Sequence, residues 1–417
     1  MTRPDIADQP MFPLRTVVLG TFLPTILFEI GVGAILPVIA ASTRALGGSL
    51  ATAGLVVALM PIGQILADVP AGAVAARIGD RAAMMLAGVV ATAGFTTAAL
   101  ASSVTTLAIG VIVVGVASST YFLARQSYLT EVTAPLKRAR VLSTLGGVHR
   151  IGQFIGPFLG AVMIAAGGLV AVYWMASVAA GLSVAAVVAV GADDGAVGAR
   201  DRLARIRAKE TVSMSRVVRE HLRVFGTLGV AVLLIGAVRG ARLSVLPLWA
   251  EHLGIDPAQT SVIFGLAGAV DMLLFYPAGR IMDQRGRLWI GIPSMLVMGL
   301  SLALLPFATT FGAVAAVAML LGLGNGLSSG ILMTLGADVA PPESRAQFLG
   351  VWRVMSDLGN AVGPLVLTGA AALGSVALGV WLMATSSVAS AFAQARWVPR
   401  YSVHANRTTR RRAGLIP

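Results

Sequence analysis

Twelve long apolar runs dominate the sequence and constrain its fold more than any other feature. A helix that crosses the hydrocarbon core of a bilayer needs ~20 mostly apolar residues, and each run reaches or approaches that length. Lipid offers the backbone no hydrogen-bond partners, so a chain of this kind must cross as helices or as a closed barrel. The length of the runs predicts helices, at Val17–Ala41, Leu50–Ala75, Ala82–Leu100, Leu107–Leu129, Val141–Ala166, Leu169–Val190, Phe225–Ala250, Ser261–Met282, Leu288–Phe307, Phe311–Leu335, Leu349–Ala372 and Ser375–Phe392.

The composition agrees with a chain whose solvent is mainly lipid. It is 57% hydrophobic and 12% charged, against roughly 25% charge in a soluble domain. The net charge of +13 lies in short segments between the runs, without a basic face and interleaved aromatic residues, so nucleic acid is not an expected partner. The basic stretch "RDRLARIRAKE" is interpreted as a linker on anionic headgroups, with nucleic-acid binding as the alternative. There is no cysteine, and the four histidines lack ligand spacing, so no metal or other cofactor is expected.

Arginine and lysine occur almost entirely in alternate connections between the runs. Positive residues concentrate in cytoplasmic loops, so both termini are predicted to be cytoplasmic, in a cell inner (plasma) membrane. The first run is longer than a signal-peptide core and is interpreted as a retained helix. The predicted organisation is a cytoplasmic tail, a six-helix bundle, a cytoplasmic linker, a second six-helix bundle and a basic cytoplasmic tail, at residues 1–16, 17–190, 191–223, 224–395 and 396–417.

The two halves of the chain repeat with an offset of 207 residues. "GQFIGPFLG" at 152–160 returns as "GNAVGPLVL" at 359–367, and "PAG" at 70–72 returns at 277–279. Glycine and proline set backbone geometry, so their recurrence indicates one six-helix unit used twice, as in transporters. The predicted fold class is therefore an all-α membrane protein with 12 transmembrane helices in two pseudo-symmetric six-helix bundles. The motif residues are Gly152, Gly156, Pro157, Gly160, Gly359, Gly363 and Pro364.

The connection after the second span of each half resembles the signature of the major facilitator superfamily, Gly-x-x-x-Asp-Arg-x-Gly-Arg-Arg/Lys. The second half reads "GRIMDQRGR", whereas the first reads "GAVAARIGDR" and has Ala76 in place of the aspartate. Asp283 is expected to cap the next helix. The resemblance covers nearly the whole chain and implies a transporter that works by alternating access. The signature positions are Gly72, Gly79, Asp80, Gly279, Asp283, Gly286 and Arg287.

The Gly-Pro motif at 152–160 resembles the fifth-span signature of that family's exporters, Gly-x-x-x-Gly-Pro-x-x-Gly. Small residues four apart let helices approach closely, and neighbouring helices can satisfy the carbonyl that proline frees. The motif therefore predicts a packing seam, and the resemblance implies export. The family's arginine midway along the fourth span is missing, because residues 109–114 read "IGVIVV", and Arg125 lies nearer the cytoplasmic end.

Charged residues inside the runs are candidate functional residues, because each costs at least ~2.5 kcal/mol at mid-membrane. Glu29 lies midway along the first run, and Arg239 and Arg242 share one face of the seventh. In the resembled family, spans one, four, seven and ten line the central cavity, which implies that Glu29 faces these arginines. Glu29 is the candidate proton carrier, and a fixed ion pair between the halves is the alternative. His149 is interpreted as a polar neighbour rather than a proton donor.

Other charges predict contacts between the halves. Arg150 is paired with Asp271 and Asp68 with Arg353, as latches rather than substrate contacts. Arg353 and Asp357 are four residues apart, so a pair within one helix is the alternative. The complete set of candidate inter-half or gating residues is Gln64, Asp68, Arg150, Asp271, Arg353 and Asp357.

The sequence predicts secondary rather than ATP-driven transport. The chain has only two lysines, Lys137 and Lys209, and neither follows glycine as a Walker loop requires. The leading interpretation is proton-coupled efflux of amphipathic, drug-like or lipid-like small molecules. The alternatives are a proton-coupled or facilitative importer of a small anionic metabolite and a non-transporting membrane sensor. An enzyme is not expected, because the sequence shows no nucleophile motif and no histidine–carboxylate cluster at a membrane surface. The expected partners are a small-molecule substrate, protons and membrane lipid, with a monomer as the functional state.

Overall fold

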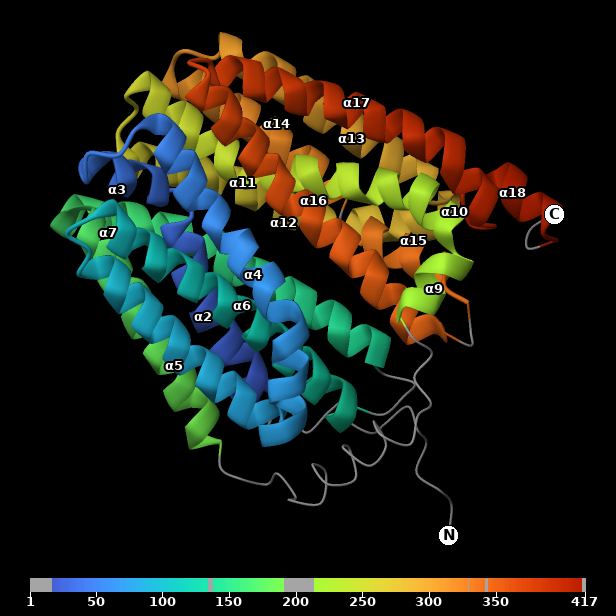
Figure 1. Ribbon diagram of the computed structural model, residues 1–417, viewed down its shortest axis with the longest axis horizontal. Helices are drawn as coiled ribbons and strands as arrows, with labels where there is room; N and C mark the ends of the chain where they lie inside the picture. Colours follow the sequence, from blue (N-terminus) through green and yellow to red (C-terminus); the bar gives the residue numbers. More distant parts are fainter. Residues whose placement is uncertain (1–16, 134–137, 191–213, 329, 342–343, 415–417) are drawn as a thin grey trace. The chain divides into compact units, whose positions relative to one another are not determined.

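The computed structural model shows a chain that is almost entirely helical within the residues it describes (Figure 1). The predicted first tail and most of the predicted linker lie outside those residues, as does Lys137. The described residues are 17–133, 138–190, 214–328, 330–341 and 344–414.

The contacts between residues divide the chain into two units. The first consists of residues 1–35 and 62–209, and the second of residues 36–61 and 210–417. The boundary passes through α4, so residues 36–61 group with the second unit although the sequence placed them in the first bundle. The helices up to residue 190 are η1 (Val18–Phe22), α2 (Leu23–Ile35), α3 (Ile39–Ala45), α4 (Leu50–Ile78), α5 (Asp80–Ala99), α6 (Val104–Val132) and α7 (Arg138–Ala189).

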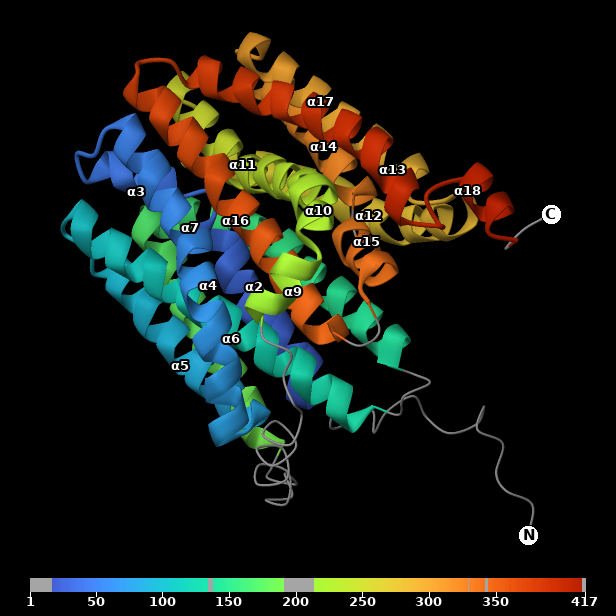
Figure 2. The same cartoon turned by 45° about the vertical axis from the view of Figure 1, so that its right-hand side comes forward.

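The remaining helices all belong to the second unit. In it α11 packs on α16, α12 on α14, and α13 on both α14 and α17 (Figure 2). These helices are α9 (Met214–Glu220), α10 (Leu222–Val224), η3 (Phe225–Gly229), α11 (Val230–Leu253), α12 (Pro257–Arg285), α13 (Leu288–Leu304), η4 (Leu305–Phe307), α14 (Phe311–Leu327), α15 (Ile331–Val339), α16 (Arg345–Ala372), α17 (Val376–Tyr401) and α18 (Arg407–Arg412).

The predicted number of membrane crossings is confirmed within the described part of the chain. Ten helical stretches there are long and apolar enough to cross a bilayer. One of them, 144–189, contains Gly167 and Gly168 in non-helical conformations, so it provides two crossings, as the sequence predicted. These ten stretches thus provide eleven crossings. The twelfth is α16, which is 28 residues long but is not among the ten. Arg353 and Asp357 interrupt its apolar composition.

Two predicted spans are interrupted helices. The run predicted to continue from Val17 to Ala41 ends as a helix at Ile35, and α3 begins at Ile39. Pro37 lies in the break, and proline lacks the N–H that an uninterrupted helix needs. The run predicted at 311–335 divides between α14 and α15, where Gly330 has φ +79°, a conformation that glycine adopts without strain.

The sequence repeat is also a repeat of contacts inside each unit. A Cβ added to Gly152 in α7 would lie 2.5 Å from the Cβ of Glu29 in α2. A Cβ added to Gly359 in α16 would lie 3.0 Å from the Cα of Gly236 in α11. Gly359 and Gly236 follow Gly152 and Glu29 by 207 residues each. The small-residue stripe is therefore the seam that the sequence predicted, used once in each half.

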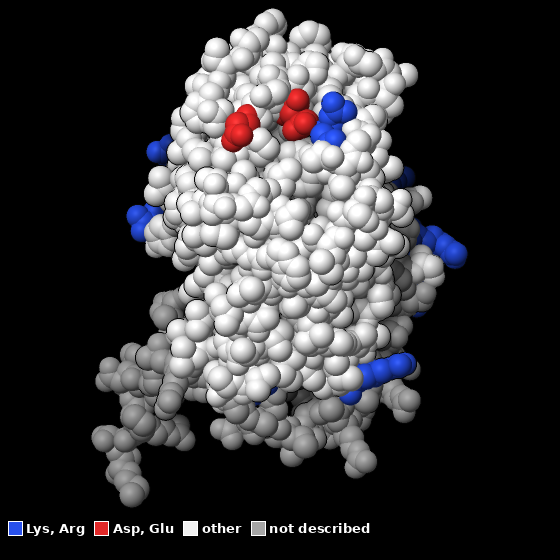
Figure 3. All heavy atoms as spheres, turned by 90° about the vertical axis from the view of Figure 1, so that its left-hand side faces the viewer, with Lys and Arg blue, Asp and Glu red and all other residues white. Residues whose placement is uncertain are grey.

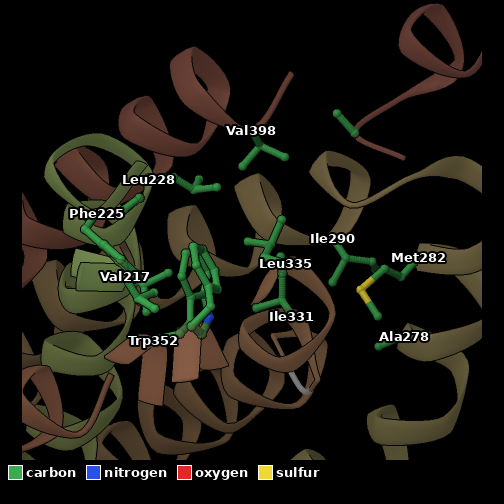
Figure 4. Close-up of a cluster of buried hydrophobic side chains, with 14 residues drawn as sticks. Val217, Phe225, Leu228, Ala278, Met282, Ile290, Ile331, Leu335, Trp352 and Val398 are labelled. Atoms are coloured by element: carbon green, nitrogen blue, oxygen red, sulfur yellow. The ribbon is translucent and has the colours of Figure 1, made fainter. Parts of the chain in front are cut away.

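A large buried cluster joins the ends of several helices of the second unit (Figure 4). Phe225, Phe348 and Trp352 form its aromatic centre, with ring centroids 4.8 Å apart for the two phenylalanines. Aromatic side chains bury large areas, and close ring pairs add stability beyond that area. This cluster fixes the end of the unit where the connections α12–α13 and α15–α16 lie.

The outer helix faces carry large apolar side chains. Leu273, Phe307 and Phe392 are each more than 70% exposed, and the face drawn in Figure 3 bears few charged side chains. Exposed apolar area of this extent is rare in soluble proteins. It fits contact with lipid, as expected for a multi-pass membrane protein.

Candidate functional site

Glu29 lies at the centre of a buried polar cluster in the first unit. Its side chain is 7% exposed, and Arg125 from α6 places Nη1 3.2 Å from Glu29 Oε1. His149 from α7 places Nδ1 2.7 Å from the same oxygen, and Gln153 donates to Oε2 at 3.5 Å. Two helices that are distant from α2 in sequence, α6 and α7, thus supply the partners of one carboxylate.

Arg125 is held by aromatic rings as well as by charge. Its guanidinium carbon lies 4.9 Å from the ring centroid of Phe122 and 5.9 Å from that of Tyr121. Tyr121 stacks on Phe28, with centroids 4.2 Å apart, and so ties α6 to the helix that carries Glu29. Arg125 is fully buried, and its Nε has no hydrogen-bond acceptor. A buried cation with an unsatisfied donor is costly, so neighbouring carboxylate charge is needed at this point.

The structure adds partners that the sequence interpretation did not assign to Glu29. Compensation was expected from Arg239 or Arg242, from water or from a proton, whereas Arg125 and His149 contact Glu29 within the same unit. His149, interpreted as a polar neighbour rather than a proton donor, makes the shortest contact to Glu29. Arg125 lies in the last third of α6, nearer its C-terminal end, and pairs with Glu29 from there. A lone arginine in an otherwise apolar run was the signal that pointed to it.

A second polar cluster lies in the second unit and includes both predicted cavity arginines. Asn325 of α14 donates to Asp271 Oδ2 at 2.7 Å, and Arg242 Nη2 lies 3.7 Å from the same oxygen. Arg239 donates from Nε to Asn325 Oδ1 at 3.2 Å. The shared face predicted for the two arginines is confirmed. Asn325, which is 3% exposed, was missed because an amide in an apolar run carries no charge signal.

Three of the other predicted gating residues, Asp68, Arg353 and Asp357, have partners inside their own units. Asp68 accepts a hydrogen bond from Ser119. Arg353 donates from Nε to Asp357 at 3.3 Å, which confirms the pair within one helix. Gln64 is half-buried in α4. The pairs that would join the halves, Arg150 with Asp271 and Asp68 with Arg353, each combine residues of different units and stay predictions.

The loop signature of the second half forms a compact charge cluster. Arg287 donates from Nε and Nη2 to Asp338 at 3.0 and 3.2 Å, and from Nη1 to Asp283 at 3.2 Å. Ser402 donates to Asp338 at 2.8 Å. Burial lowers the pKa of Arg287, but the bonds and charges of Asp338 and Asp283 outweigh it, so this pKa lies above its usual value. Asp283 was expected to cap α13, but it pairs with Arg287 instead, and α13 has no side-chain cap.

The glycines of the signature have different roles. Gly79 and Gly286 have φ of +89° and +107°, a region in which glycine is favoured, so both mark the turn between two spans. Gly72 and Gly279 have nothing within 4 Å of an added Cβ. Asp80 is buried in the first turn of α5, where the helix dipole favours a negative charge.

Comparison with known proteins gives a family match over nearly the whole chain. The profile of the Major Facilitator Superfamily matches residues 21–364 and 228–416. The multidrug resistance protein MdtH of Edwardsiella ictaluri (strain 93-146) is 26% identical over 293 residues, covering 70% of each chain. MdtH of Yersinia pestis (strain Pestoides F) is 24% identical over 322 residues, covering 76% of this chain and 77% of that protein.

Solved structures share the fold at lower sequence identity. A POT family transporter in complex with a thioalcohol-conjugated peptide has a TM-score of 0.75 at 13% identity, covering 92% of this chain and 96% of its own. A D-xylose-proton symporter has a TM-score of 0.72 at 14% identity, covering 94% and 98%. With the twelve crossings, the repeated halves and the paired loop signatures, these matches show that the chain belongs to the major facilitator superfamily.

Proposed function

We propose that this transporter is a proton-coupled exporter of amphipathic small molecules, drug-like or lipid-like, that works by alternating access. The observation that carries the proposal is the buried ion pair of Glu29 and Arg125 inside membrane-crossing helices. Relatives named as multidrug resistance proteins support export of drug-like compounds. The lack of a Walker loop in the sequence supports secondary transport.

The mechanism follows from the charge of the pair. When Glu29 is ionised, it and Arg125 offset each other in a poorly solvated setting. A proton on Glu29 removes the negative charge and leaves Arg125 as an uncompensated cation, which is costly there. The two protonation states therefore favour different surroundings, and proton binding shifts the population between conformations. A lipophilic cation that approached Glu29 would compete with the proton, which is the relation that antiport requires.

Efflux of ethidium from proteoliposomes with an imposed pH gradient tests the proposal. Glu29→Gln keeps the shape of the side chain and removes its titration, so proton-driven accumulation is lost while ethidium counterflow without a gradient persists. Glu220→Gln is the matched control, because Glu220 lies on α9 outside the spans, in an exposed pair with Arg216. Normal proton-driven transport by Glu29→Gln would place the proton elsewhere, with Asp271 or Asp68 next. If Glu29→Gln does not fold, and adding Arg125→Gln to it restores folding, the ion pair has a structural role and carries no transported proton.

The second candidate function is uptake of a small anionic metabolite. It is favoured by Arg239 and Arg242, which lie within one cluster around Asp271 and Asn325. Arginine is well suited to carboxylates and phosphates. The direction of a proton-driven flux separates uptake from export. The absence of any solute flux in liposomes would instead favour a sensor that does not transport.

The proposal includes gating pairs between the halves, Arg150 with Asp271 and Asp68 with Arg353, and a functional monomer with both termini in the cytoplasm. The sequence has no cysteine, so introduced cysteines report cleanly. Arg150→Cys with Asp271→Cys is expected to form a disulfide in one transport state only. A cysteine at Thr408, which is exposed on α18, is expected to react with a membrane-impermeant maleimide only in inside-out vesicles. Reaction from the outside would reverse the proposed orientation.

A further inference from the structure

The contacts around Glu29 cannot all be hydrogen bonds in one protonation state. Glu29 Oε1 lies 2.7 Å from His149 Nδ1. Arg125 approaches both atoms, with Nη1 3.2 Å from Oε1 and Nη2 3.2 Å from Nδ1. The guanidinium nitrogens of arginine only donate, whereas an imidazole nitrogen either donates or accepts. The state of Nδ1 therefore decides which of its two contacts is a bond.

Proton counting gives two arrangements for this triad. If Nδ1 carries a proton, it donates to Oε1, and its approach to Arg125 Nη2 brings two donors together. If Nδ1 is bare, its one lone pair accepts either from Arg125 Nη2 or from a proton on Glu29 Oε1, and the shorter 2.7 Å contact favours the proton on Glu29. A single proton placed between Nδ1 and Oε1 satisfies the short contact in both cases. We propose that Glu29 and His149 share one transported proton, and that His149 is the residue that delivers it to Glu29.

Exposure sets the direction of delivery. The side chain of His149 is 30% exposed, against 7% for Glu29 and none for Arg125. In the proposed path, a proton from water meets the more exposed imidazole before the carboxylate. In the proposed step a hydronium ion gives a proton to Nε2, and the proton on Nδ1 passes to Oε1. The products are water, a neutral imidazole that carries its hydrogen on Nε2, and a neutral carboxylic acid, so atoms and charge balance.

The way Arg125 engages Glu29 argues against a permanent ion pair. Permanent arginine–carboxylate pairs are frequently bidentate, with two parallel bonds. Here both Arg125 and His149 converge on Oε1, whereas among the described residues Oε2 accepts from Gln153 at 3.5 Å. Arg125 Nε is buried without an acceptor. The carboxylate of Glu29 thus contacts both Arg125 and the titratable His149, and it does not form a bidentate pair with the guanidinium.

The charged and titratable groups near this proton come from α6 and α7. From α6 come Arg125 and Tyr121, whose hydroxyl lies 3.2 Å from Ser183 Oγ. From α7 comes Arg150, next to His149 in sequence and half-buried. Arg125 keeps its charge throughout, so a second proton on the pair would place a positive imidazolium beside the positive guanidinium. The fixed cation therefore favours one shared proton over two.

The repeat does not duplicate this site. The residue 207 positions after Glu29 is Gly236, and the one after His149 is Ser356. The helix seam is common to both halves, as the glycine contacts show, but the proton-binding side chains occur in the first half alone. The expected stoichiometry at this site is one proton per chain.

Nitrogen-15 NMR of histidine-labelled protein in lipid nanodiscs tests the shared proton without a transported substrate. With four histidines in the chain, the variant H221Q/H252Q/H404Q leaves His149 as the one remaining signal and keeps the triad intact. We expect Glu29→Gln in this background to change the His149 tautomer and move its titration midpoint by about one pH unit or more. Infrared difference spectra are expected to show a protonated carboxyl band that titrates together with His149 and is absent in Glu29→Gln. An unchanged midpoint and tautomer in Glu29→Gln would overturn the proposal.

Transport then separates this inference from the proposed function, on which its role in export rests. His149→Gln is expected to slow proton-driven ethidium efflux by at least ~10-fold and to change its pH profile, while counterflow stays within about twofold of wild type. Added imidazole is expected to restore part of the rate, which a purely structural role of His149 would not allow. His221→Gln is the control. If Glu29 and His149 titrate together but no proton-driven flux is seen, the proposed function is wrong and the shared proton stands. Normal proton-driven flux in His149→Gln would show that His149 does not deliver the proton.

Discussion

Gly152 of α7 lies against Glu29 of α2 so closely that a Cβ at position 152 would come within 2.5 Å of the Glu29 Cβ and 2.8 Å of the carbonyl oxygen of Ile26. The Gly-Pro motif of the fifth span therefore belongs to the proposed proton site, because Gly152 sets how closely α7, which carries His149 and Gln153, approaches Glu29. Helix packing and site chemistry meet at this one glycine.

Gly152→Ala is expected to destabilise the protein by roughly 1–3 kcal/mol, because one helix must move to admit the methyl group. Proton-driven efflux is expected to fall more than stability, since His149 and Gln153 move with α7. Thermal unfolding in detergent and efflux assays measure the two effects. Gly181→Ala is the control, because an added Cβ there meets nothing within 4 Å. Equal behaviour of the two variants would show that the seam tolerates a methyl group.

Removal of Arg125 is expected to destabilise the protein. Arg125→Gln leaves the Glu29 carboxylate buried beside His149 alone, and breaking a buried pair costs about 3–5 kcal/mol. The loss is expected to be smaller at about pH 5 than at about pH 8, because a proton on Glu29 removes the uncompensated charge. Unfolding of Arg125→Gln, Glu29→Gln and the double variant at both pH values measures the coupling. Additive losses at both pH values would contradict the pairing.

The segment after α17 is expected to clamp the connection between α12 and α13. The backbone N–H groups of Arg287 and Leu288 donate to the carbonyls of His404 and Ala405 at 3.1 and 3.0 Å. A Cβ on Gly286 would lie 2.6 Å from the Ala405 carbonyl oxygen, and its φ is +107°. Gly286→Ala is therefore expected to cost roughly 1–3 kcal/mol, as measured by thermal unfolding.

Gly279 supplies the matched control for that loop. It belongs to the same signature, yet an added Cβ there meets nothing within 4 Å. Gly279→Ala is expected to unfold at nearly the wild-type temperature. A similar loss in both variants would mean that the signature glycines act through helix flexibility and not through contact with the C-terminal segment.

The two carboxylates around Arg287 are expected to contribute unequally to the free energy of unfolding. Asp338 is 10% exposed and accepts two bonds from the guanidinium, whereas Asp283 is 76% exposed and accepts one. Asp338→Asn is expected to cost about 1–3 kcal/mol, and Asp283→Asn less than about 1 kcal/mol. Chemical unfolding of the two variants decides the order. A larger loss in Asp283→Asn would show that the exposed bond, which lies within the loop signature, carries the stability.

The sequence by itself determined the features that lipid imposes along the chain. Apolar length fixes where helices cross, because the backbone finds no partners in the bilayer except its own. The 207-residue repeat then fixed which helices are equivalent, and the contacts of Gly152 and Gly359 follow it. These properties are local or periodic, so composition and spacing reveal them.

The tertiary structure alone decided which charges meet. Glu29, Arg125 and His149 are separated by 96 and 24 residues along the chain, and their contact depends on how α2, α6 and α7 are rotated about their axes. One residue of helix rotation turns a side chain by about 100°, and apolar runs with little amphipathicity do not specify that angle. The sequence therefore identified Glu29 as a buried charge that needs a partner. Only the packing of the three helices showed that Arg125 and His149 both contact it.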